Sequence, residues 1–293
     1  MATQRTIGVI GGSGLYGLDG LEDVEHQRLE TPFGPPSDEL IIGRLGDARL
    51  VFLPRHGKGH RILPHEVNSR ANIHAMKQLG VEWIIAVSAV GSMREEIKPG
   101  DLVLVDQFID RTKARPSSFF GDGAAGHIGF ADPICPELHD VVVEASRAAA
   151  QAAGAGARVH ERGTYVVMEG PAFSTRAESL LYRSWGVDVI GMTALPEAKL
   201  AREAEICYAT VALATDYDCW HQAEAAVTVD AVLAVLRRNV ATARDIVRRS
   251  VGLMAPKRSC SCPDAARGAL MTDPSQVSPD ARRRLALVLG KYL

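Results

Sequence analysis

Short apolar runs alternate with amphipathic stretches along this chain, and this alternation constrains its fold more than any other feature. Runs that are rich in β-branched residues and too short for helices predict buried strands. They occur at Thr6–Ile10, Glu39–Ile42, Arg49–Pro54, Trp83–Ser88, Asp101–Val105, Thr164–Met168, Asp188–Ile190 and Cys207–Thr215. Apolar residues at helical spacing predict helices at about His65–Leu79, Glu137–Ala153, Thr175–Ser184, Pro196–Ala204 and Thr228–Ser250. Because strands and helices alternate, we predict an α/β fold.

Local signals support several boundaries and divide the chain into two parts. Gly80 suits the position just past the first helix, and Thr175 with Glu178 forms a capping box at the start of the third. We predict one main domain over residues 1–253. Residues 254–293 are rich in Pro, Ser, Cys and Asp and end in a helical pattern at Asp280–Leu289, which predicts a tail packed on that domain.

Composition excludes some classes of function. The chain has 293 residues and a formal net charge of −2, without the basic surface that nucleic acid or an anionic membrane would require. The sequence lacks a secretory signal and any apolar run that could span a membrane, so neither partner is expected. Five cysteines, of which Cys135, Cys207 and Cys219 are scattered, favour a reducing cytoplasm.

A glycine-rich segment, Gly12-Ser13-Gly14-Leu15-Tyr16-Gly17, follows the first predicted strand and matches the glycine spacing of dinucleotide-binding folds. The helix that should follow is interrupted by Asp19-Gly20 and by the proline-rich run 31–36, which disfavours a dehydrogenase. The segment could instead present N–H groups and the Ser13 hydroxyl to phosphate. An ordinary strand-ending turn explains it equally well.

Two more predicted strands end in polar or small residues. The run Arg55-His56-Gly57-Lys58-Gly59-His60 offers donors to an anion, although a solvated basic loop explains it more simply when it is taken alone. A metal site at His56, His60 and His65 is disfavoured because glycines separate the first pair. Ser88-Ala89-Val90-Gly91-Ser92 would let a ligand approach the main chain, or would form a simple turn.

The run Glu169–Thr175 brings an aromatic ring and two hydroxyls to the end of another predicted strand. Phe173 could stack on a flat base or belong to the core, and the two interpretations are equally good. Ser174 or Thr175 could do no more than cap the helix that follows.

Asp216-Tyr217-Asp218 is the sharpest chemical signal, because two carboxylates flank a tyrosine directly after a buried-looking strand. Side chains two residues apart in extended chain share a face. Two like charges held together should raise the pKa of at least one carboxyl, which would keep a proton available for general acid catalysis. A solvated acidic turn is the alternative, and the adjoining Cys219-Trp220 makes it less attractive.

In these and other motifs the chain resembles the methylthioadenosine phosphorylases of the trimeric purine nucleoside phosphorylase superfamily, over roughly residues 6–251. The matching motifs are Ile10-Gly11-Gly12-Ser13-Gly14-Leu15, Thr31-Pro32-Phe33-Gly34, Arg55-His56-Gly57, Glu95-Glu96-Ile97-Lys98-Pro99-Gly100-Asp101, Asp106-Gln107-Phe108-Ile109-Asp110-Arg111-Thr112, Glu169-Gly170-Pro171, Met192-Thr193 and Ala214-Thr215-Asp216-Tyr217-Asp218-Cys219-Trp220. The resemblance implies a central mixed twisted sheet, partly barrel-like, surrounded by helices.

The resemblance also implies a role for each matching site residue. Phosphate contacts would come from Ser13, Arg55, His56, Ser88, the Ala89 backbone and Thr193. The purine would lie among Phe173, Ser174, Asp216 and Asp218, and the ribose against Met192. The methylthio group would meet Val229, Val232, His60 and a His127 contributed by a neighbouring subunit. Asp216 would protonate N7, and Asp218 would accept from the exocyclic amine.

The implied reaction is phosphorolysis of 5'-methylthioadenosine to adenine and 5-methylthioribose 1-phosphate, with phosphate as co-substrate and no cofactor or metal. Gly191 stands where many members have asparagine, so a preference for methylthioinosine or adenosine stays open. A phosphate-independent nucleosidase is a further alternative, which Arg55 and His56 disfavour.

Cys260-Ser261-Cys262 resembles the Cys-x-Cys of some thermostable family members, where it can form a disulfide. Two reduced thiols are an equally good interpretation in a cytoplasmic protein. The resemblance further implies a homotrimer or a dimer of trimers.

Overall fold

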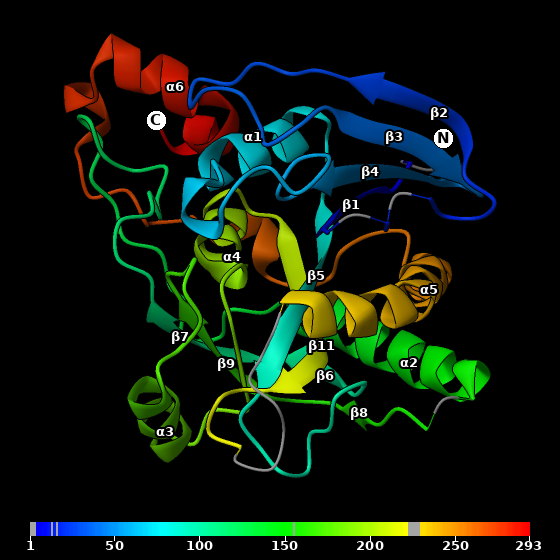
Figure 1. Ribbon diagram of the computed structural model, residues 1–293. Coiled ribbons are helices and arrows are strands. Elements are labelled where there is room, and N and C mark those ends of the chain that lie inside the picture. Colours follow the sequence, from blue (N-terminus) through cyan, green and yellow to red (C-terminus); the bar gives the residue numbers. More distant parts are fainter. Residues whose placement is uncertain (1–3, 13, 16, 155, 222–228) are drawn as a thin grey trace.

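Strand β5 (Trp83–Ser92) is the branch point of a mixed sheet in the computed structural model of the chain (Figure 1). The structure describes residues 4–12, 14–15, 17–154, 156–221 and 229–293, without the side chains of 229–238, and the sheet has 11 strands within those ranges. One path runs β2-β3-β4-β1-β5-β10-β9-β7, while β11 pairs with β5 and β6, and β6 pairs with β8. Among these strands the ends of the two paths do not pair with each other, so the sheet is open.

The strands other than β5 have the following bounds. They are β1 (Thr6–Gly11), β2 (Glu22–Gln27), β3 (Leu40–Leu45), β4 (Ala48–Pro54), β6 (Leu102–Val105), β7 (Gln107–Arg111), β8 (Val159–His160), β9 (Thr164–Met168), β10 (Val189–Gly191) and β11 (Cys207–Tyr217). The helices are α1 (Ser69–Gln78), α2 (Pro136–Ala153), α3 (Arg176–Ser184), α4 (Ala194–Glu203), α5 (Val229–Leu253) and α6 (Pro279–Leu289).

Four neighbouring strands run parallel and therefore end at the same edge of the sheet. β1 pairs in parallel with β4 and β5, and β11 pairs in parallel with β5. The register places Pro54 beside Gly11, and Ala212 beside Ser88. In open α/β sheets ligands bind outside the carboxyl ends of such strands. The motifs that follow β4, β5 and β11 thus meet at one edge.

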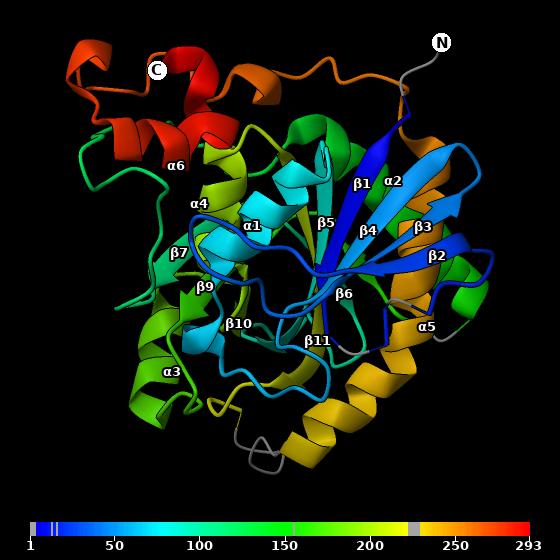
Figure 2. The same cartoon turned by 90° about the horizontal axis from the view of Figure 1, so that it is seen from above.

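Helices cover both faces of the central strands (Figures 1 and 2). Helices α2 and α5 pack against each other on one side, and α1 and α4 pack against each other on the opposite side. The side chains between these layers form one large apolar core that includes Ile7, Phe52, Ile84 and Val211. No helix in the described part of the chain is long and apolar enough to cross a membrane.

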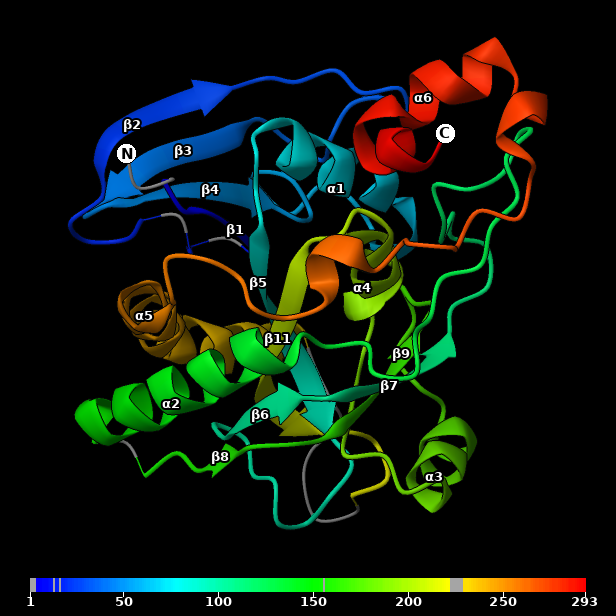
Figure 3. The same ribbon diagram turned by 180° about the vertical axis from the view of Figure 1, so that it is seen from behind.

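The tail is built into the same core. Figure 3 shows it, orange to red, running from α5 across the back of the molecule to α6. Cys262, Ala266 and Leu285 join the main apolar cluster, and Arg258 donates to the Glu205 carbonyl at 2.9 Å and to Glu82 at 2.8 Å. These apolar contacts and the Arg258 ion pair hold the tail against α4, β11 and α1.

The predicted strands and helices are all present, with boundaries within three residues except at the start of α1 and at the end of β5, which continues to Ser92. That helix begins at Ser69, where the Asn68 side chain accepts from the Ala71 N–H, because Pro64 precedes it in a separate 3-10 turn. Gly80 follows α1 with a left-handed φ of 76°, and the Thr175–Glu178 capping box is formed. The sequence patterns missed β2, β7 and β8. β2 is an exposed polar edge strand without apolar alternation.

Candidate active site

The predicted anion-binding residues lie at the common strand edge. The Ser88 hydroxyl on β5 and the Thr193 hydroxyl at the start of α4 are 2.9 Å apart. The Arg55 N–H donates to the Gly11 carbonyl at 3.0 Å, which holds the end of β4 against the end of β1. Ala89, opposite Leu213 of β11, continues the same stretch of β5. The structure therefore gathers serine, threonine, arginine and main-chain groups from four elements.

Most N–H groups of the Arg55 guanidinium donate hydrogen bonds to partners within the protein. It forms a bidentate pair with Glu197, at 2.9 Å from Nε and 3.0 Å from Nη2, and both side chains are buried. It also donates to the carbonyls of Val87 at 3.0 Å and Ile10 at 3.4 Å. Arginine has five N–H donors. Four of these donors are thus used within the protein, where they hold β1, β5 and the end of β4 against α4.

His56 is buried and neutral. The pKa of His56 is lowered to about 4, first by burial and then by the positive charge of Arg55. Its Nδ1 lies 2.9 Å from the Ile62 carbonyl, and a carbonyl can only accept, so Nδ1 donates. The proton therefore sits on Nδ1, and Nε2 is left as a hydrogen-bond acceptor. The ring stacks on His60 at 4.3 Å between centroids.

The lowered pKa of His56 predicts an acid-side loss of stability. The unfolded chain binds a proton at His56 near pH 6.5 and the folded chain only near pH 4, so the unfolding free energy falls as pH drops through that interval. The full loss is about 3 kcal/mol. We expect His56→Gln to flatten this slope in urea unfolding measured from pH 7 to 4 in phosphate-free buffer. The same change at exposed His65 is the control; an equal effect of both variants would contradict the assignment.

The two aspartates occupy the end of β11. A register shift between Ala214 and Asp216 marks a bulge at Thr215, whose hydroxyl donates to Asp216 Oδ2 at 2.6 Å. A Cβ placed on Gly91 of β5 would lie 3.1 Å from Asp216 Oδ1 and 3.5 Å from Asp218 Cβ. Both side chains therefore lie close to β5, and the glycine provides the space for them.

The pKa of Asp218 is raised, as the sequence predicted for one member of the pair. Burial is the largest contribution, and the hydroxyls of Ser179 and Ser174 oppose it. The negative charge of Glu178 also raises this pKa. The sequence argument thus gave the right direction, and burial is a cause that it did not consider.

Arg115, which sequence reasoning missed, connects two loops near the predicted purine-binding residues. Arg115 donates to the carbonyls of Met192 at 2.6 Å and Leu195 at 2.9 Å, and to those of Met168 at 3.2 Å and Glu169 at 2.5 Å. It thereby joins the loop after β9 to the loop after β10. A lone arginine in an irregular stretch carries no sequence signal for such a role.

The loop after β9 presents Phe173 and Ser174 near Asp218. The Cys219 thiol donates to the Ser174 carbonyl at 3.3 Å, next to Asp218 in the chain. The Ser174 hydroxyl donates to the Met168 sulfur at 3.6 Å. Phe173 is 47% exposed, so its ring does not belong to the core. An exposed ring on this loop can stack on a planar base.

The glycine at position 191 has a steric explanation. A Cβ on Gly191 would overlap the Tyr165 hydroxyl and lie 3.0 Å from Tyr165 Cζ. Tyr165 is fully buried, and its hydroxyl has no hydrogen-bond partner of normal geometry within the described residues. Tyr165 thus fills the space that a side chain at position 191 would need.

This overlap predicts a measurable coupling between the two positions. Gly191→Ala should lower the free energy of unfolding by about 1–3 kcal/mol, as overpacking does. Tyr165→Phe should be near neutral, because the hydroxyl that it removes makes no hydrogen bond of normal geometry to the described residues. In urea unfolding the double variant should be more stable than Gly191→Ala alone. Strict additivity would show that Tyr165 is not the cause.

Other predicted site residues lie elsewhere or outside the described part of the chain. Ser13 and the side chains of Val229 and Val232 belong to the undescribed residues. His127 is exposed on a loop whose N–H donates to the Ala269 carbonyl at 2.9 Å, and no described contact joins it to the residues above. Cys260 and Cys262 are free thiols in the structure.

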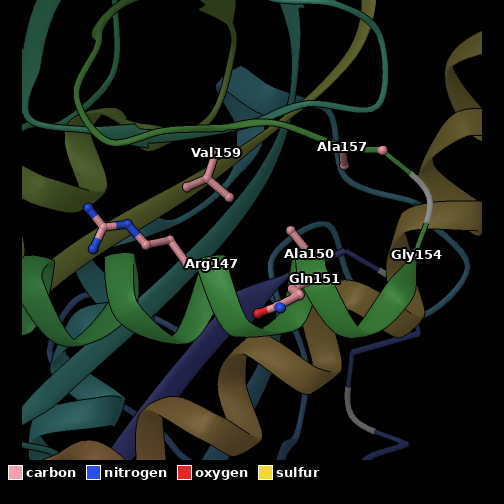
Figure 4. A pocket seen from close by; sticks show the side chains of 7 residues that line it. Arg147, Ala150, Gln151, Gly154, Ala157 and Val159 are labelled. Carbon is pink, nitrogen blue, oxygen red and sulfur yellow. The ribbon is translucent and has the colours of Figure 1, made fainter.

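A surface depression near α2 is separate from this site. It lies between the end of α2 and the segment that leads into β8, and Figure 4 shows Arg147, Ala150, Gln151 and Val159 along it. No residue predicted to bind substrate or phosphate lines it.

The open mixed sheet has the nucleoside phosphorylase fold. The phosphorylase superfamily matches residues 6–252. S-methyl-5'-thioadenosine phosphorylase of Geobacter sulfurreducens is 58% identical over 291 residues, covering 99% of this chain and 100% of that protein. That of Gloeobacter violaceus is 56% identical over 290 residues, covering 99% of this chain and 96% of that one.

Solved structures agree with the sequence relatives. A methylthioadenosine phosphorylase from an antarctic soil metagenomic library superposes with a TM-score of 0.92 at 47% identity, covering 98% and 100% of the two chains. The methylthioadenosine phosphorylase of Schistosoma mansoni, solved with adenine, superposes with a TM-score of 0.81 at 36% identity, covering 97% of this chain and 98% of that one. The chain belongs to the S-methyl-5'-thioadenosine phosphorylase family of the phosphorylase superfamily.

Proposed function

We propose that this protein cleaves 5'-methylthioadenosine with inorganic phosphate, giving adenine and 5-methylthioribose 1-phosphate. The observation that carries the proposal is that one edge of the sheet holds two groups of residues. They are Arg55, His56, Ser88 and Thr193, and the pair Asp216 and Asp218. Family membership and the 58% identical phosphorylase support the same reaction.

At the anion end, phosphate would meet the hydroxyls of Ser88 and Thr193, the Ala89 main chain and the remaining N–H of Arg55. Neutral His56 would accept from a phosphate hydroxyl through Nε2, because its Nδ1 already donates to Ile62. Ser13 would complete this shell. The groups orient phosphate beneath the anomeric carbon, where its charge stabilises the cationic sugar of the transition state. The reaction needs no cofactor.

At the base end, Asp216 would protonate N7 as the glycosidic bond breaks, and Asp218 would accept from the exocyclic amine. Phe173 and Ser174 would border the purine, and Met192 the ribose. A positioned acid matters because neutral adenine leaves far more readily than its anion. Val229, Val232 and His60 would surround the methylthio group.

We further propose a cytoplasmic homotrimer, or a dimer of trimers, in which His127 of one subunit completes the site of the next. The exposed position of His127, with no described contact to the other site residues, supports this arrangement. A His127→Ala variant with a raised KM for methylthioadenosine and unchanged mass in solution would support the shared site.

The reaction class is tested by the requirement for phosphate. We expect adenine release from methylthioadenosine to stop in phosphate-free buffer and to return with added phosphate, together with the sugar 1-phosphate. Full turnover without phosphate would instead identify a nucleosidase. Matched rates on methylthioadenosine and methylthioinosine then decide the base preference, and faster cleavage of methylthioinosine would overturn the adenine assignment.

A further inference from the structure

Four cysteines from three distant parts of the chain meet at the end of the sheet opposite the candidate active site. Cys207 begins β11, Cys135 precedes α2, and Cys260 and Cys262 belong to the tail. Their four sulfur atoms all lie within 4.8 Å of one another, and those of Cys207 and Cys260 are 3.4 Å apart. Cys135, Cys207 and Cys262 are buried and Cys260 is partly buried. No part of the proposed reaction uses them.

We propose that these four cysteines bind one zinc ion in a structural site. Zinc prefers four thiolates in a tetrahedron, and a Zn–S distance of about 2.3 Å sets the sulfurs about 3.8 Å apart. The spacing in the structure brackets that value. An iron–sulfur cluster of several iron atoms needs more widely spread thiolates, so one tetrahedral ion fits better.

Backbone hydrogen bonds hold three of the four positions independently of any ion. The Cys135 N–H donates to the Tyr208 carbonyl at 3.0 Å, and the Cys207 N–H donates to the Glu82 carbonyl at 2.9 Å. On the tail, the Ser259 N–H donates to Glu137 at 3.1 Å, which fixes the chain just before Cys260. A preorganised set of ligands lowers the entropy cost of metal binding.

Charge and proton balance are consistent with the proposal. Each thiol releases a proton when it binds the ion, so four thiolates and Zn²⁺ form a unit of net charge −2. The ion would link the start of β11, the start of α2 and the tail, and so would stabilise the attachment of residues 254–293.

The test is zinc content, measured on the untagged full-length protein purified under reducing conditions without chelator. We expect about one zinc ion per chain, and its release by an organomercurial as the four cluster thiols are titrated in addition to Cys219. The double variant C260S/C262S should lose the zinc. Cys219→Ser, which changes the one cysteine outside the cluster, should keep it.

Measurements on the wild-type chain keep the proposal testable if the double variant does not fold. We expect a strong chelator to remove the ion and to lower Tm, and added zinc to restore it. A zinc content per chain that stays near zero after incubation of the reduced protein with zinc salt would overturn the proposal. A non-reduced mass that is lighter by the hydrogens of one or two disulfides, with all zinc absent, would also overturn it.

Discussion

Asp216→Asn is expected to lower kcat/KM for methylthioadenosine by about 10²–10⁴-fold, the usual worth of a general acid. Asparagine keeps the shape of the side chain but cannot release a proton to N7. Because the Thr215 hydroxyl already donates to Asp216 Oδ2, the amide can retain that contact through its oxygen. Steady-state rates at saturating phosphate, on methylthioadenosine and on the 6-oxo analogue, provide the measurement. The preference should shift away from the 6-amino substrate.

Asp218→Asn is the matched control, since it changes the neighbouring carboxyl on the same strand end. Its main effect should be on KM and on the choice between 6-amino and 6-oxo bases, because an unpaired carbonyl or amine is costly in a closed site. Burial raises the pKa of Asp218, so this residue is the other candidate proton donor. If Asp218→Asn loses turnover and Asp216→Asn keeps it, then Asp218 is the proton donor and Asp216 accepts from the exocyclic amine.

Glu197→Ala is expected to lower the free energy of unfolding by about 3–5 kcal/mol, because it leaves the Arg55 charge buried without its partner. Both side chains are at most 3% exposed, and Glu197 also accepts from the Tyr208 hydroxyl at 2.8 Å. Urea unfolding, with the m-value checked for each variant, measures the effect.

The exposed pair Arg147–Glu161 supplies the control for this prediction. Glu161→Ala removes a carboxylate from a solvent-facing ion pair and should cost less than about 1 kcal/mol. A double variant, Arg55→Met with Glu197→Leu, should recover much of the lost stability while losing phosphate binding. A Glu197→Ala cost as small as that of Glu161→Ala would show that the buried pair has little importance for folding.

Much of the fold was readable from sequence because its strands and helices are dictated locally. The buried strands are β-branched runs, and helix ends coincide with residues such as Gly80 and Thr175 whose backbone preference is independent of context. β2, by contrast, pairs at an exposed edge with polar residues on both faces, and β8 is only two residues long. Their strand character comes from hydrogen bonds to a neighbour, which no local pattern encodes.

The sequence by itself determined the chemical inventory of the site: carboxylates after one strand, basic and hydroxyl groups after others, and the family that combines them. Only the tertiary structure decided how the groups are used. It committed Arg55 to Glu197, buried His56 in the neutral form and placed Tyr165 where a side chain at position 191 would stand. It also brought Cys135 and Cys207 to the tail cysteines. Each of these depends on contacts between residues far apart in the chain, whose distances and burial are set by packing and not by spacing along the sequence.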